Sequence, residues 1–80
     1  MPRDFTLHDL VLQINGQPKT FAGDPLPATL EDILQQLNLK TDRVAVEHNG
    51  AIVSRAKWAE TPVVAGDRIE IVHFVGGGVE

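Results

Sequence analysis

Few residues in this 80-residue sequence are of a type that carries chemistry, and the most unusual group is a run of three glycines, Gly76-Gly77-Gly78. Cysteine is absent, which excludes disulfides, thiolate metal sites and thiol catalysis. The three histidines, His8, His48 and His73, lack the spacing of metal ligands, and we identify no nucleophile–base pair. We therefore expect no catalytic residue and no metal site, and we assign the histidines to ordinary surface or edge positions.

The composition narrows the class of protein further. Seven Lys and Arg against eleven Asp and Glu give a net charge of −4, and the basic residues are scattered apart from Arg55 and Lys57. Nucleic-acid binding needs a basic stripe or patch, so we expect protein partners and no nucleic acid. The sequence contains neither an apolar membrane span nor the apolar run of a signal peptide. We expect one small cytoplasmic domain that does not bind membranes.

An apolar strand leads directly into the glycines. We predict this last strand over residues 68–75, with Ile69 and Ile71 on one face. Because successive side chains of a strand point to opposite faces, Val72 and Phe74 lie on the other face. If the isoleucines pack on the core, Val72 and Phe74 are exposed beside the glycines and form a natural partner contact. A bulge of one residue would reverse this assignment.

Three more strands are predicted ahead of the last one. Residues 10–14 and 18–22 form a hairpin across Asn15-Gly16, a dipeptide that suits a type I′ turn. Residues 44–48 form another strand, closed by a second Asn-Gly pair at positions 49 and 50. These segments predict a small sheet.

One main helix is predicted over residues 29–37. Its apolar residues recur with the period of one helix face, at Leu30, Ile33, Leu34 and Leu37. Thr29 is placed to cap the helix. A single helical turn is expected over residues 54–58, with Trp58 as a packing anchor. A helix between strands, packed on one face of a mixed sheet, gives an α+β roll.

Part of the sequence resembles a known family. Residues 46–53, then Arg55 and Trp58, and above all the run 66–78 are similar to the ThiS family, the sulfur carrier proteins of thiamine biosynthesis. The resemblance covers about residues 10–78. It implies the ubiquitin-like β-grasp fold, with a mixed sheet of four to five strands and one main helix.

The resemblance also gives a domain division. Residues 1–9 form an N-terminal extension that we expect to be frayed. Residues 10–75 form the β-grasp domain, and residues 76–80 form a flexible glycine tail.

The resemblance implies that the carboxylate of the last glycine is the working group. That residue is Gly78, or Gly77 if the chain is trimmed further. An adenylyltransferase resembling ubiquitin-activating enzymes joins the carboxylate to AMP with ATP, sulfur from a donor protein displaces AMP, and a thiazole synthase accepts it. The chain is then a protein co-substrate, not an enzyme, and binds no cofactor itself. Glycine suits a tail that threads a narrow channel, and residues 75–78 reach about 13 Å when extended.

The sequence departs from the family pattern at its end, because Val79 and Glu80 follow the glycines. We interpret them as a cloning remnant in preference to a segment removed by a protease or to loss of the carrier role. Two other functions stay open for the chain. One is a sulfur carrier of the type of the molybdopterin synthase small subunit. The other is a β-grasp interaction module that needs no free terminal glycine.

Overall fold

The computed structural model describes residues 9–39 and 43–74. The elements, in chain order, are β1 (Leu10–Ile14), β2 (Gln17–Phe21), α1 (Leu30–Gln36), β3 (Val44–His48), β4 (Ala51–Val53), the 3₁₀ helix η3 (Arg55–Glu60) and β5 (Arg68–His73). None of the helices in these two ranges is long and apolar enough to cross a membrane.

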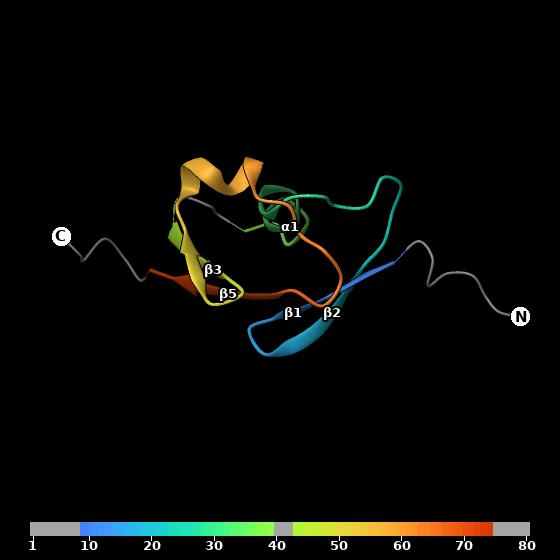
Figure 1. Cartoon of the computed structure of the whole chain (residues 1–80), viewed down its shortest axis with the longest axis horizontal. Helices are drawn as coiled ribbons and strands as arrows, with labels where there is room; N and C mark the ends of the chain where they lie inside the picture. The colour runs from blue at the N-terminus through green and yellow to red at the C-terminus, as the bar shows by residue number, and fades with distance from the viewer. Residues whose placement is uncertain (1–8, 40–42, 75–80) are drawn as a thin grey trace, which may run out of the picture.

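The strands form one five-stranded sheet with the order β2-β1-β5-β3-β4. β5 lies at its centre, parallel to β1 and antiparallel to β3, while the two outer pairs are antiparallel hairpins. Figure 1 shows α1 and η3 together on one side of the sheet. The predicted mixed sheet with one main helix is confirmed, with five strands.

Both predicted Asn-Gly turns are confirmed. The φ angles are 52° at Asn15 and 84° at Gly16, and 52° at Asn49 and 91° at Gly50. Positive φ at both central residues is the requirement of a type I′ turn, which Asn and Gly meet at low cost. The returning strand of the first hairpin begins at Gln17 and not at Pro18, so its predicted range is shifted by one residue.

The helix is one residue shorter at each end than predicted, and Thr29 caps it as expected. The Thr29 hydroxyl accepts a hydrogen bond from the Asp32 N–H at 3.2 Å, and Asp32 Oδ2 accepts one from the Thr29 N–H at 3.2 Å. This reciprocal pair is a capping box. The Asp32 carboxylate also accepts a bond from the Ala28 N–H at 2.9 Å, and this bond, with those to Thr29, keeps the pKa of Asp32 below its ordinary value despite desolvation.

The core lies between the sheet and the two helices. Its fully buried side chains are those of Leu12, Leu30, Ile33, Leu34, Val46 and Ile69. Trp58 on η3 is buried, and its indole Nε1–H donates to the Val53 carbonyl at 2.9 Å. The expected packing role of Trp58 is therefore confirmed. The predicted helical turn is a 3₁₀ helix that begins one residue later and ends two residues later than expected.

Candidate functional site

The glycine tail and the N-terminal extension fall largely outside the described residues. Residues 1–8 and 75–80 are outside the ranges that the structure describes. The roles assigned to Gly76, Gly77 and Gly78 therefore stay predictions. Strand β5 is the described element that leads to the tail. It ends at His73, whereas the sequence predicted a strand to Val75.

The core face of β5 is as predicted. Ile69 is fully buried and Ile71 is 7% exposed, and both belong to the hydrophobic core. The register sets Ile69 opposite His48 and Ile71 opposite Val46 on β3. β5 is therefore held by apolar packing as well as by strands on both of its edges.

The opposite face of β5 carries the predicted exposed pair. Val72 is 59% exposed and Phe74 is 53% exposed. The Phe74 N–H donates to the Arg43 carbonyl at 2.8 Å, which holds its backbone beside the start of β3. Two apolar side chains thus lie in solvent at the end of β5 that leads to the glycines. Their exposure is confirmed, and their role in docking stays a prediction.

Asn15 joins the first hairpin turn to β5. Its N–H donates to the Ile69 carbonyl at 2.9 Å, and its side-chain Oδ1 accepts from the Ile71 N–H at 2.6 Å. Pairing between β1 and β5 covers only two residue pairs, so the Asn15 side chain continues it beyond the end of β1. The turn residue therefore also fixes the register of the central strand.

Asn49 plays a similar part in the second hairpin turn. Its N–H donates to the Arg68 carbonyl at 2.7 Å, and its side-chain Oδ1 accepts from the Arg68 N–H at 2.8 Å. The side-chain Nδ2 also donates to Asp67 Oδ1 at 3.2 Å. The start of β5 is thus bound to the turn that joins β3 and β4.

Asp67 is the centre of a buried polar cluster at the start of β5. It is 9% exposed, and its Oδ2 lies 2.8 Å from His48 Nε2 and 2.9 Å from the donating Val64 N–H. Burial raises the pKa of this carboxyl, but the hydrogen bonds from His48, Val64 and Asn49 outweigh it, so the pKa lies below its ordinary value. Asp67 therefore connects the second hairpin turn and the segment before β5 to the start of that strand.

The contact between His48 and Asp67 is the feature that sequence reasoning missed. The sequence predicts an ordinary surface or edge position for His48, yet its side chain is only 16% exposed and pairs with Asp67. The two residues are 19 positions apart, and no local pattern joins them. The register of β3 against β5 brings them together. Within the described ranges, no group of three or more His, Asp or Glu side chains is placed to hold a metal ion.

Comparison with known proteins adds to this geometry. A model of the ThiS family matches residues 12–78. The chain belongs to the ThiS family. The matched range includes all three glycines as well as β5 and the polar cluster, and the expected family is confirmed.

A solved ThiS structure confirms the fold. The crystal structure of the thiamine biosynthesis protein ThiS from Geobacter metallireducens superimposes with a TM-score of 0.71 at 31% identity, covering 86% of this chain and all of that one. The β-grasp roll expected from the sequence is therefore the fold of the chain.

Two curated relatives show where ThiS-like sequences occur. The sulfur carrier protein ThiS of Bacillus subtilis is 38% identical over 68 residues, which are 85% of this chain and the whole of that protein. A thiazole synthase of Magnetococcus marinus is 39% identical over 67 residues, which are 84% of this chain. The matched segment is only 20% of that enzyme's length.

Proposed function

We propose that the chain is a sulfur carrier that delivers sulfur for the thiazole moiety of thiamine. The observation that carries this proposal is the match to the ThiS family, which continues past β5 to Gly78. A relative named as a sulfur carrier also matches over its whole length. In this function the chain is a co-substrate of two enzymes and performs no catalysis itself.

The working group is the carboxylate of Gly78, or of Gly77 if the chain is trimmed further. A carboxylate is a poor acyl donor, so an adenylyltransferase resembling ubiquitin-activating enzymes first joins it to AMP, and ATP loses pyrophosphate. Sulfide (HS⁻) released by a donor protein then forms the bond to the carbonyl carbon, and AMP leaves with the electron pair of the broken C–O bond, which gives a thiocarboxylate. ATP is bound by the partner, and the chain holds no cofactor. Each of these steps takes place in the cytoplasm.

The geometry of β5 supports this role. Asn15 and Asn49 bind its backbone from either side, and its core face is buried. A strand anchored on both edges fixes the direction in which the chain leaves the domain, and such preorganisation lowers the entropic cost of binding. Val72 and Phe74, exposed at the end of the strand, form the docking contact in this proposal.

The acceptor of the sulfur in this proposal is a thiazole synthase. Support comes from proteins of that name in which a segment similar to this chain makes up one fifth of the length. A carrier-like segment within such an enzyme keeps donor and acceptor at a high effective concentration. A separate carrier gains the same proximity by binding.

Intact mass spectrometry tests the proposal. The full chain and a version ending at Gly78 are incubated with ATP, the sulfur donor and the activating enzyme from the same cells. We expect the version ending at Gly78 to gain the mass difference of one oxygen replaced by sulfur. A version that lacks Gly77 and Gly78 should still bind the activating enzyme and gain nothing. Absence of the mass gain in every version, with binding intact, would instead favour an interaction module.

A further inference from the structure

Two carboxylates face each other on the outer side of the sheet. The register pairs Glu47 on β3 directly with Glu70 on β5, and both residues are exposed. Side chains opposite each other on one face have Cβ atoms about 5 Å apart, and like charges there destabilise the sheet. The ion pairs between described residues, His48–Asp67 and Lys57–Glu60, include neither of them. Within residues 9–39 and 43–74, no ion pair of Glu47 or Glu70 offsets this repulsion.

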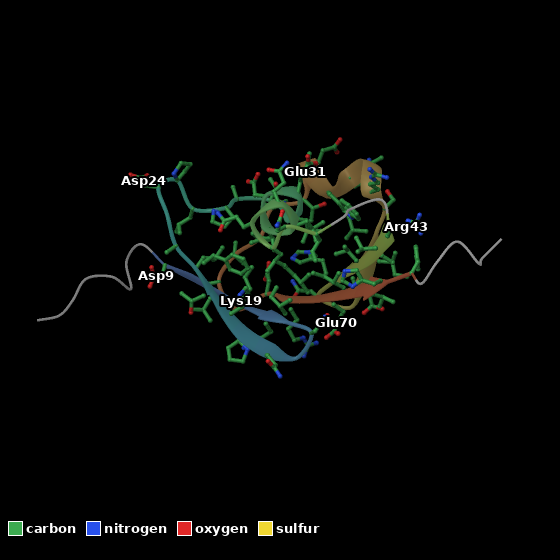
Figure 2. The ribbon with its side chains drawn as sticks, turned by 180° about the vertical axis from the view of Figure 1, so that it is seen from behind. Asp9, Lys19, Asp24, Glu31, Arg43 and Glu70 are labelled. Atoms are coloured by element: carbon green, nitrogen blue, oxygen red, sulfur yellow. The ribbon has the colours of Figure 1, made fainter. Side chains whose placement is uncertain are left out.

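Apolar side chains lie beside this acidic pair, while the exposed Arg68 precedes Glu70 by two residues on the same face of β5. Ile52 on β4 is opposite Glu47 and is 76% exposed. Val72 and Phe74 follow Glu70 along the same face of the strand. We call these five residues the outer patch: Glu47, Ile52, Glu70, Val72 and Phe74. Figure 2 shows Glu70 on the side of the sheet away from Glu31 and α1, so the helices do not cover this face.

We propose that Glu47 and Glu70 together receive one lysine or arginine side chain of the enzyme that activates the tail, and that Ile52, Val72 and Phe74 pack around it. This inference rests on the proposed carrier function and adds the chemistry of the partner's contact face. The partner presents a basic side chain set among apolar groups. The paired carboxylates, which repel each other in the free chain, share this cation in the complex, so one net negative charge remains in place of two.

Charge and burial favour this occupant over a purely apolar one. The chain carries a net charge of −4, and an apolar face without a cation would have to desolvate two carboxylates with no compensation. A cation between the carboxylates offsets part of that cost. It also relieves the cross-strand repulsion, and closure of the apolar rim strengthens each charge interaction by excluding water. Complementary charge of this kind also selects against wrong partners.

The test uses Glu47→Gln and Glu70→Gln, singly and together, in the full chain. Dissociation constants for the activating enzyme from the same cells are measured by calorimetry over a range of NaCl concentrations. We expect the double variant to bind about tenfold more weakly and with a flatter salt dependence. Thermal unfolding of the free chain should move in the opposite direction, with Tm raised by about 1–4 °C, because the repulsion is gone.

A matched control is Glu60→Gln, which removes the same charge from an exposed position on η3. Its affinity should stay within about twofold of the wild type, because exposed ion pairs contribute little. If the double variant binds as tightly as the wild type, the role of the acidic pair is wrong and the carrier function stands. If the double variant has a lower Tm than the wild type, its weaker binding is explained by its loss of stability. That result would also overturn the inference. If the wild-type chain itself does not bind the activating enzyme, the proposed function fails with it.

Discussion

The two faces of β5 carry similar apolar residues, but those on one face are buried and those on the other are exposed. Ile69 and Ile71 on one face are buried in the core, while Val72 and Phe74 on the other are more than half exposed. Apolar groups in solvent add nothing to the stability of the free chain, so the outer pair is available for binding. The comparison shows that the apolar residues on one face of the strand stabilise the fold, while those on the other face are available for recognition. The register of the strand determines which residues lie on each face.

The largest expected effect is on the core face. Ile69→Ala should lower the free energy of unfolding by about 2–5 kcal/mol, because it removes a fully buried side chain and leaves a cavity. Val72→Ala, at a position three residues after Ile69, should change the free energy of unfolding by less than about 0.5 kcal/mol. Urea denaturation of both variants measures the difference. A comparable loss at Val72 would show that the outer face is covered in the free chain.

The next largest effect is expected for a substitution on the outer face, and it should change binding affinity without changing stability. Phe74→Ala should weaken binding to the activating enzyme by about tenfold or more, as expected for an aromatic anchor, and leave Tm unchanged. Val64→Ala is the matched control, because Val64 is 62% exposed but lies before the start of β5, at the opposite end of the strand from Phe74. Equal affinities for both variants and the wild type would remove Phe74 from the docking surface.

The division between faces depends on the register of β5, which the two turn asparagines fix. Both have positive φ, so Asn15→Gly and Asn49→Gly keep the turn and carry the same entropic cost in the unfolded chain. The Asn49 side chain makes two hydrogen bonds to the start of β5, whereas that of Asn15 makes one. We expect the Asn49 variant to lose about 1 kcal/mol more of the free energy of unfolding. Chemical denaturation of the two variants measures this difference. An equal loss of the free energy of unfolding in both variants would contradict the prediction.

Much of this division could be predicted from the sequence, because it follows local rules. The alternation of Ile69, Ile71 and Val72 assigns the faces, and the Asn-Gly pairs specify the turns. The asparagine side chains that bind β5 are different. Asn15 and Ile71 are 56 positions apart, and only the order of strands in the sheet brings them together. The acidic pair, Glu47 and Glu70, is likewise a product of register and not of any local pattern.

The smallest expected effect concerns the polar cluster that starts β5, and it depends on pH. The folded chain holds the pKa of Asp67 below its ordinary value, so Asp67 contributes stability above the pKa of an unfolded aspartate. That contribution is lost as pH falls through the lower, folded pKa. Thermal unfolding between pH 7 and pH 3 should therefore show a fall in Tm at the acid end. Part of that fall should disappear in Asp67→Asn, which cannot titrate.

Asp32 also has a lowered pKa, so Asp32→Asn is the control that separates the helix cap from the start of β5. If Asp67→Asn keeps the full acid dependence of the wild type, the cluster does not hold the start of the strand. The register that separates the two faces would then rest on the core and on the two turn asparagines.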